Sequence, residues 1–259
     1  MPFPNFVGKH AHDAFFTPQE SIALRQQKVP RDFTPPTGVV VCYQSSLLQH
    51  ILAVEAVERV DIGLGEAYLL PRTGSQVAVI GGFGIGAPAA AIVVEHLIAF
   101  GVREVVNIGT AGALQRALRI GDIVVCTSAI RDEGLSHHYL PSAPYAHPSA
   151  ALTTRLQDAL TAAGRSWTAG PSWTIDAAYR ETVAEARHYQ REGVLTVEME
   201  AAAIFAVAEY RQVAAAAAFV ISDSLADQVW DPKFSAPSVQ HGLVHLYGAA
   251  VDALADLKP

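Results

Sequence analysis

The most constraining feature of this sequence is a largely apolar stretch, residues 194–227, that carries acidic residues at two points. Every side chain from 201 to 208 is Ala, Ile, Phe or Val, so a helix there must be packed within protein on all sides. Residues 213–221 form an unbroken apolar run, which is typical of a strand in a parallel sheet covered on both faces. The acidic residues that bracket these two elements are Glu198, Glu200 and Asp223.

Two explanations of these acidic residues follow from the sequence alone. Ligands of open α/β sheets bind outside the carboxyl ends of the strands. If residues 195–197 and 213–221 are parallel neighbours, the three carboxylates meet at such an edge and form a site. The alternative is structural, because acidic side chains also cap helices and favour their N-termini. Both explanations stand at this point.

Composition narrows the class of protein. The chain has 259 residues, of which 51% are hydrophobic, so it can bury the large core of one α/β domain. We expect an N-terminal arm over residues 1–38, rich in Pro and polar residues, and a single domain over residues 39–259. The net charge is −7 without a Lys/Arg cluster, which disfavours a nucleic-acid partner and favours small molecules.

The sequence also indicates a soluble cytoplasmic protein. Cys42 and Cys126 each lie in a predicted buried strand and lack the spacing of a metal or redox pair, which suits a reducing compartment. No stretch approaches the roughly 18 apolar residues of a membrane span, and residues 1–10 lack the regions of a signal peptide.

Hydrophobic periodicity and turn residues predict alternating strands and helices. The predicted strands are residues 39–43, 66–70, 76–80, 105–108, 123–130, 167–173, 195–197 and 213–221. The predicted helices are residues 18–27, 47–57, 88–100, 150–163, 182–192 and 239–257, together with the apolar helix from residue 201.

Two glycine-rich turns follow predicted strands. The first, Gly82-x-Gly84-x-x-Ala87, leads into a helix and so aims free N–H groups at an anion. It also matches a loose dinucleotide fingerprint, but Glu104 precedes its strand where the acidic residue should follow. A phosphate- or sugar-binding loop is therefore favoured over a nicotinamide-dependent dehydrogenase. In the second turn, residues 109–112, Thr110 can donate its hydroxyl and N–H to an anion or a sugar.

A group of metal-ligating residue types occurs at Asp132, Glu133, His137 and His138. Adjacent histidines on an extended chain point to opposite faces, so both cannot readily bind one ion. We therefore expect no metal.

Taken in order, the strand-end segments resemble the purine nucleoside/uridine phosphorylase superfamily, which includes the related nucleosidases. The resemblance covers about residues 39–255 and implies a single-domain three-layer α/β/α fold with a mixed central sheet. It also implies a cytoplasmic homo-oligomer, dimer or hexamer, that acts in nucleoside salvage without a cofactor beyond phosphate as co-substrate. The segments that carry the resemblance are Gly84-Ile85-Gly86-Ala87-Pro88, residues 107–114, Gly121-Asp122-Ile123-Val124, Val197-Glu198-Met199-Glu200-Ala201 and Ile221-Ser222-Asp223.

The resemblance implies cleavage of the bond between ribose C1′ and a base, which makes the chain a pentosyltransferase. A carboxylate on the ribose hydroxyls tightens its hold as positive charge develops on the sugar. The implied positions are Glu200 at the ribose hydroxyls, Met199 at the sugar face, Glu198 and residues Trp173 to Tyr179 at the base, Asp223 as the acid, Thr110 at the nucleophile, and Ala111, Gly112 and Gly84 as further contacts.

The sequence departs from the phosphorylase pattern at the phosphate. Phosphorylases of this family usually hold phosphate with an Arg three positions before the Thr and with a Gly-Asp-Pro-x-Arg loop. Here Asn107 stands at the first position, and residues 42–48 contain no Arg. Asn at this position also resembles the hydrolytic nucleosidases, so hydrolysis by water is the alternative to phosphorolysis. Residues 129–140 and 173–181 resemble a phosphorylase-type branch and favour phosphorolysis. The phosphate candidates are Asn107, Thr110, Arg72, Arg131 and Arg180. A non-catalytic nucleoside-binding protein is a further alternative.

Asp223 favours a purine substrate. A purine leaves more easily when N7 is protonated, and a carboxyl group near N7 can supply that proton. Uridine-specific members generally lack this Asp and carry a Gln-x-Arg pair that residues 178–187 do not clearly contain, although residues 129–140 resemble uridine enzymes. The arm, with His10 and His12, is expected to reach a neighbouring subunit's 5′-hydroxyl.

Overall fold

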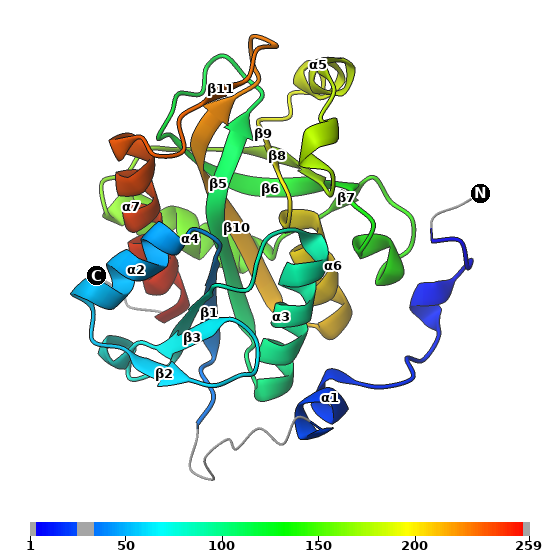
Figure 1. The fold of residues 1–259 in the computed structure, drawn as a ribbon, viewed down its shortest axis with the longest axis vertical. Coiled ribbons are helices and arrows are strands. Elements are labelled where there is room, and N and C mark those ends of the chain that lie inside the picture. Colours follow the sequence, from blue (N-terminus) through cyan, green and yellow to red (C-terminus); the bar gives the residue numbers. More distant parts are fainter. Residues whose placement is uncertain (1–3, 25–33, 256–259) are drawn as a thin grey trace.

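The computed structural model describes residues 4–24 and 34–255, which form an eleven-stranded mixed sheet with helices on both faces (Figure 1). This is the three-layer α/β/α fold expected from the sequence. The strand order is β11-β10-β6-β8-β9-β5-β1-β4-β3-β2, with β7 on β6. The strands are β1 Gly38–Cys42, β2 Glu58–Val60, β3 Glu66–Leu69, β4 Val77–Gly81, β5 Glu104–Ala113, β6 Ile123–Asp132, β7 Tyr145–Ala146, β8 Trp167–Ile175, β9 Thr196–Glu198, β10 Ala214–Ser224 and β11 Asp231–Pro232.

Seven α-helices and four short 3-10 helices accompany these strands within the described ranges. The α-helices are α1 Pro18–Leu24, α2 Ser45–Val54, α3 Ala87–Phe100, α4 Ala150–Ala162, α5 Val183–Arg191, α6 Ala201–Arg211 and α7 Pro237–Ala255. The 3-10 helices are η1 Lys9–Ala11, η2 Pro71–Thr73, η3 Ser136–His138 and η4 Ala178–Arg180. No helix in this part of the chain is long and apolar enough to cross a membrane.

The central strands are apolar at every position because both faces are covered. Along β1, Val39 and Val41 pack with the side chains of α3 and α6, whereas Val40 and Cys42 pack with those of α2, α4 and α7. All four side chains are completely buried. Successive residues of a strand point to opposite faces, so such a strand contributes to two cores at once.

The sheet closes on itself beside the carboxyl ends of β5 and β10. β10 pairs with β5 in parallel and with β6 antiparallel, and the ring β5-β10-β6-β8-β9 closes through the antiparallel pairing of β9 with β5. The condition that residues 195–197 and 213–221 be parallel neighbours is not met, because β9 and β10 flank β5 on either side. Ring closure nevertheless brings the ends of β5, β9 and β10 together.

Two predicted strand ends are also corrected. Residues 109–112 were expected to form a turn, but β5 continues through them to Ala113, since β10 and β9 supply partners for the small residues. Asp223 was expected just past its strand, yet it lies inside β10, after a bulge that pairs it with Gly112. The bulge re-aims the Asp223 side chain at the end of the ring.

Several element boundaries agree with the local sequence signals that predict them. The predicted hairpin of residues 66–80 is confirmed, with β3 antiparallel to β4 across η2. Pro88 lies in the first turn of α3, and Gly101 ends that helix with a φ of 119°, a left-handed conformation that favours glycine. Thr182 begins α5 through a complete capping box with Glu185. The predicted ends at residues 25–27 and 256–257 lie outside the described residues.

Candidate functional site

A cavity of about 280 Å³ lies where the ends of β5, β9 and β10 meet. Half of its lining residues are among those predicted from the sequence: Thr110, Ala111, Gly112, Glu198, Met199, Glu200 and Asp223. The other lining residues have no role predicted from the sequence; they are Tyr43, Gln44, Ile85, Glu181, Val197, Ser222 and Phe234.

Glu198 is the fixed point of the cavity. Its Oε1 accepts hydrogen bonds from the hydroxyls of Thr174 and Ser172, and its Oε2 accepts from the backbone N–H groups of Glu200 and Ala201. Burial raises the pKa of Glu198, and these four donors oppose that rise. With both oxygens occupied, the carboxyl caps the N-terminus of α6 and orients Glu200, in agreement with the structural explanation for this one residue.

Glu200 is the carboxyl group that this cap positions. It is 7% exposed, and its Oε1 accepts a 2.6 Å hydrogen bond from the backbone N–H of Gly86 in the glycine loop. Burial, followed by the nearby Glu198, raises the pKa of Glu200 to about 8. The glycine loop thus contacts the acidic pair through Gly86, and a substrate hydroxyl can donate to the remaining acceptor capacity of Glu200.

Asp223 faces the same cavity from β10. Its Oδ1 accepts from the Ser222 hydroxyl at 2.8 Å, and its Oδ2 accepts from Trp230 Nε1 at 3.0 Å. A Cβ added at Gly112 would lie 3.1 Å from Asp223 Oδ2 and 2.7 Å from a Leu225 methyl carbon. Gly112 therefore leaves the space that the Asp223 carboxyl occupies.

A polar network lies behind Thr110. The Tyr43 hydroxyl donates to Asn107 Oδ1 at 2.8 Å, and Gln44 Nε2 donates to the Thr110 hydroxyl oxygen at 3.1 Å. Asn107 Nδ2 and Gln44 Oε1 are buried without a partner among the described residues. Burial, and after it the charges of Glu200 and Glu198, raises the pKa of Tyr43, so its hydroxyl remains a donor. Asn107 is fully buried and lies behind the lining, whereas Gln44 and Thr110 belong to it.

The cavity is acidic. Four carboxyl groups line it, from Glu181, Glu198, Glu200 and Asp223, and no Lys, Arg or His of the described ranges does so. Two buried acids so close together disfavour ionisation of both, which agrees with the raised pKa of Glu200.

The three arginines predicted as phosphate ligands lie elsewhere. Arg72 pairs with Glu55 at 2.8 Å, in the turn before β4. Arg131 is buried and donates to Ser136 Oγ and to the carbonyl oxygens of residues 140 and 141, so it braces the loop after β6. Arg180 is exposed on η4 and does not line the cavity. None of the three lines the acidic cavity of the described chain, and their role toward phosphate, including one across a subunit interface, stays a prediction.

Three further predicted contacts also fall outside the lining. Trp173 is fully buried, donates from Nε1 to Asp132 and packs on Tyr189, so it belongs to the core. Tyr179 projects into solvent. Gly84 lies in the loop, with a φ of 100°, but Ile85 and Gly86 make the contacts with the cavity and Glu200.

The residues missed by sequence reasoning come mostly from junctions between elements. Gln44 precedes α2, Glu181 follows η4, and Phe234 follows β11. An acidic residue directly before a capping box was the one available signal for Glu181.

His137 and His138 lie in η3 and not on an extended chain. The described residues contain no group of three His, Cys, Asp or Glu suited to a metal.

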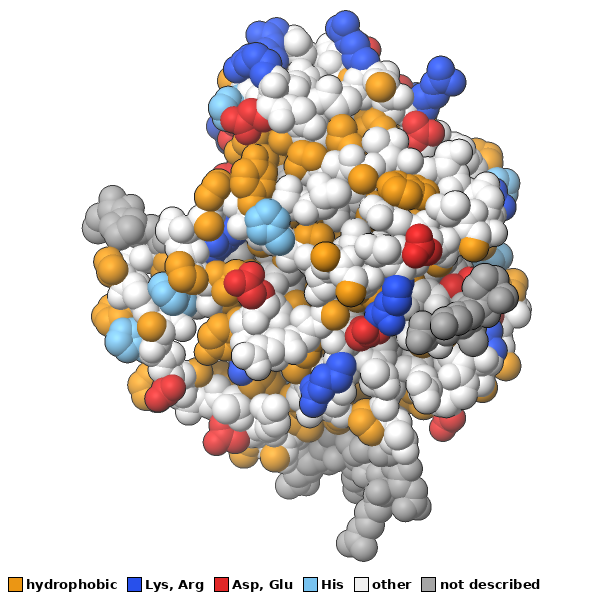
Figure 2. All heavy atoms as spheres, turned by 180° about the vertical axis from the view of Figure 1, so that it is seen from behind, with side chains coloured by type: hydrophobic (Ala, Val, Ile, Leu, Met, Phe, Trp, Pro, Cys, Tyr) orange, Lys and Arg blue, Asp and Glu red, His pale blue; other side chains and the backbone are white. Residues whose placement is uncertain are grey.

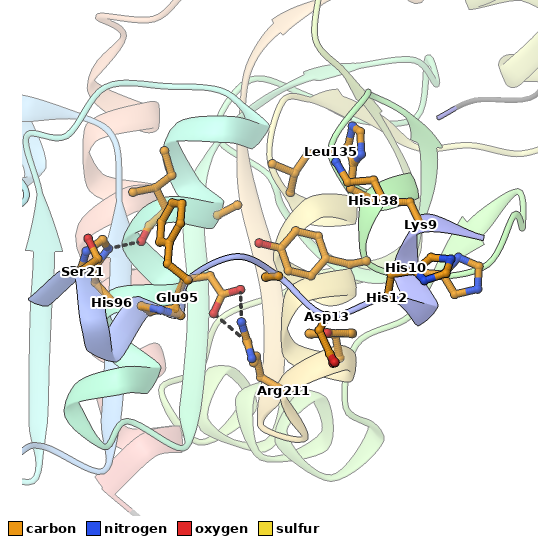
Figure 3. A pocket seen from close by; sticks show the side chains of 17 residues that line it. Lys9, His10, His12, Asp13, Ser21, Glu95, His96, Leu135, His138 and Arg211 are labelled. Atoms are coloured by element: carbon orange, nitrogen blue, oxygen red, sulfur yellow. Dashed lines mark hydrogen bonds and ion pairs between the residues drawn. The ribbon is translucent and has the colours of Figure 1, made fainter. Parts of the chain in front are cut away.

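A second cavity, of about 530 Å³, separates the arm from α3, η3 and the end of α6 (Figure 3). The arm residues His10 and His12 line it, so within one chain they lie apart from the acidic cavity. The Glu95–Arg211 ion pair, at 2.8 Å, crosses its wall. Figure 2 shows hydrophobic and histidine side chains gathered near the N-terminal segment, where Phe6, Phe15 and Phe16 are exposed.

Comparison with known proteins identifies the family. The family model described as the phosphorylase superfamily matches residues 45–243. A guanosine phosphorylase of Halorubrum lacusprofundi is 36% identical over 142 residues, 55% of this chain and 59% of that protein. A uridine phosphorylase of Haemophilus influenzae is 32% identical over 144 residues, 50% of this chain and 57% of that protein. A DeoD-type purine nucleoside phosphorylase of Bacillus cereus is 32% identical over 155 residues, 59% of this chain and 65% of that protein.

The matched segments thus span less than two thirds of these curated relatives. Solved structures agree on the fold. The purine nucleoside phosphorylase of Toxoplasma gondii superposes with a TM-score of 0.77 at 19% identity, over 88% of this chain and 94% of that one. The uridine phosphorylase of Vibrio fischeri superposes with a TM-score of 0.72 at 24% identity, over 86% and 92%.

Proposed function

Because this chain belongs to the phosphorylase superfamily, we propose that it cleaves the N-glycosidic bond of a purine nucleoside with phosphate, releasing free base and ribose 1-phosphate. The observation that carries this proposal is the convergence of Glu200, Asp223 and Thr110 on one cavity at the ends of three strands. The names of the relatives, which act on guanosine, uridine or purine nucleosides, support the class of substrate.

Glu200 acts on the ribose. In its ionised form it accepts hydrogen bonds from the 2′- and 3′-hydroxyls, and the C1′–N bond breaks through a sugar that carries positive charge. The hydrogen bonds to an ionised carboxylate then strengthen, so binding is tightest in the transition state. Glu198 holds Glu200 in place through its contact with the Glu200 N–H, and Met199 covers the sugar face.

Asp223 lies on the leaving-group side. The electrons of the broken bond move into the purine, and a proton placed on N7 lets the base leave as a neutral molecule. Ser222 and Trp230 hold the Asp223 carboxyl at the end of β10, with its oxygens directed by their hydrogen bonds. A pyrimidine has no N7, so this arrangement favours purines over uridine.

Thr110 lies on the nucleophile side. Its hydroxyl oxygen accepts from Gln44, which leaves its hydroxyl proton free to donate to a phosphate oxygen. The described lining lacks a cation, and phosphate is best held by Arg or Lys. We therefore place the cation on a neighbouring subunit of a homo-oligomer, and we expect the arm that carries His10 and His12 to reach a neighbour's 5′-hydroxyl.

The experiment incubates the protein with guanosine, inosine, adenosine and uridine, with and without phosphate, and follows free base and ribose 1-phosphate. Phosphate-dependent cleavage of the purine nucleosides is expected. Sedimentation at micromolar concentration should find at least a dimer, and a fully active monomer would contradict the shared site. Binding of nucleosides without any turnover would select a non-catalytic binding protein. Turnover only with a nicotinamide would select a dehydrogenase.

Hydrolysis is the second candidate, and one observation favours it. A cavity with four carboxyl groups and no cation among its described lining repels a phosphate dianion but accommodates water. Cleavage at equal rates without phosphate, with free ribose as product, would establish this candidate in place of phosphorolysis.

A further inference from the structure

Two carboxyl groups that line the acidic cavity, those of Glu181 and Asp223, differ in how they are held. Both oxygens of Asp223 accept hydrogen bonds, from Ser222 and Trp230. The carboxyl of Glu181, which lines the same cavity, accepts none from the residues that the structure describes. Two hydrogen-bond donors therefore fix the position of the Asp223 carboxyl, whereas no donor among the described residues fixes that of Glu181.

The charges around Glu181 reinforce this difference. Asp223 faces it from β10 and Glu185 from α5, and Glu198 and Glu200 line the same cavity. Arg180, its neighbour in the chain, is exposed, and no basic side chain in the described ranges lines the cavity. Partial burial, and after it the charges of Asp223 and Glu185, raises the pKa of Glu181 to about 7.

Building on the proposed function, we propose that Glu181 and Asp223 form a proton-sharing pair in which Glu181 holds the proton that the departing base receives. As the C1′–N9 bond breaks, its electron pair moves into the purine and the Glu181 O–H proton is transferred to the base, directly or through Asp223. The base leaves neutral and Glu181 becomes a carboxylate. A proton from solvent restores the acid before the next turnover.

The position of Glu181 in the fold suits this role. It follows η4 and precedes the capping box of Thr182 and Glu185, which fixes the start of α5. The backbone that carries Glu181 is therefore anchored on its C-terminal side, while its carboxyl is left without a competing hydrogen bond. A carboxyl that can gain and lose a proton near neutral pH is suited to general acid catalysis.

The test compares two substrates that differ only in the leaving group. A purine nucleoside needs a proton on its base, whereas 4-nitrophenyl β-D-ribofuranoside releases a stable phenolate and needs none. Glu181→Gln is expected to lower kcat/KM for guanosine or inosine by about 10²- to 10⁴-fold and to change the nitrophenyl riboside by less than about threefold. Glu192→Gln, an exposed glutamate just beyond α5, is the matched control and should leave both rates unchanged.

The outcomes separate this inference from the proposed function. Full purine activity in Glu181→Gln, or an equal loss of kcat/KM with both substrates, would overturn the proton-sharing pair. Turnover of the purine nucleoside by the wild type would still support the proposed function. A wild type that cleaves neither substrate would overturn both.

A second measurement does not depend on activity. In protein with ¹³C-labelled glutamate carboxyls, the Glu181 resonance should titrate near pH 7 and shift to lower pH in Asp223→Asn, because a neighbouring negative charge is removed. Titration of Glu181 near the ordinary value for a glutamate in the wild type would contradict the pair.

Discussion

Replacing Glu200 by Gln should make the protein less sensitive to alkaline pH. The pKa of Glu200 is raised from 4.5 to about 8 because the carboxyl is buried beside Glu198. The folded protein therefore retains this proton where the unfolded chain has lost it. The stabilising contribution is complete below pH 4.5, declines as pH rises, and is lost once pH passes about 8.

The size of the effect follows from the difference between the pKa of Glu200 in the folded protein and in the unfolded chain. One unit of pKa difference corresponds to about 1.4 kcal/mol, so the wild type should lose roughly 2 to 3 kcal/mol of unfolding free energy from this group between pH 6 and pH 8.5. Glu200→Gln cannot ionise, and its side-chain carbonyl can still accept the Gly86 N–H. The variant should lack this decline.

Urea unfolding of wild type and Glu200→Gln at the two pH values measures the difference, with Glu192→Gln as the control for removal of an exposed carboxylate. The slope with respect to urea should be the same for all three proteins. If Glu200→Gln loses as much stability between pH 6 and pH 8.5 as the wild type does, the carboxyl is not held protonated by burial and the reasoning about its environment fails.

Three further predictions concern activity and loop structure. The pH profile of kcat/KM should be a bell with its maximum between pH 7 and 8, because Glu200 must ionise, with a pKa near 8, and Glu181 must stay protonated, with a pKa near 7; a flat profile would contradict both roles. Arg131→Met should cost about 1 to 3 kcal/mol in urea unfolding, since it removes the donor of the buried Ser136 hydroxyl oxygen and of two loop carbonyls; unchanged stability would show that the loop is held by other contacts. Gly112→Ala should lower kcat at least about tenfold because the methyl group crowds the acid, whereas Gly248→Ala, with open space around it in α7, should keep full activity.

Much of the fold could be predicted because its signals are local. Helix α3 begins at a Pro in its first turn and ends at a Gly, and an apolar run such as residues 213–221 needs cover on both faces. Strand partners are not local. Whether Glu198 and Asp223 meet depends on the closing of the ring through β5, which no residue pattern in either segment encodes.

The site could be predicted where chemistry lies in sequence motifs, and not where it lies at junctions. Thr110 and Asp223 lie within the last four residues of β5 and β10, Glu200 lies two residues after β9, and all three line the cavity. Trp173 belongs to a predicted strand, but the alternation that sends it into the core depends on where β8 begins and ends. The sequence does not show that the Arg131 guanidinium donates hydrogen bonds to loop carbonyls, because that contact forms only in the fold.

The most direct measurement is a crystal structure of the Asp223→Asn variant with a purine nucleoside, since the variant should bind substrate and turn it over slowly. We expect the ribose 2′- and 3′-hydroxyls on Glu200, the base between Glu181 and residue 223, and C1′ facing Thr110. A nucleoside bound in the cavity beneath the arm, or bound beside β5 with its ribose away from Glu200, would contradict the proposed site.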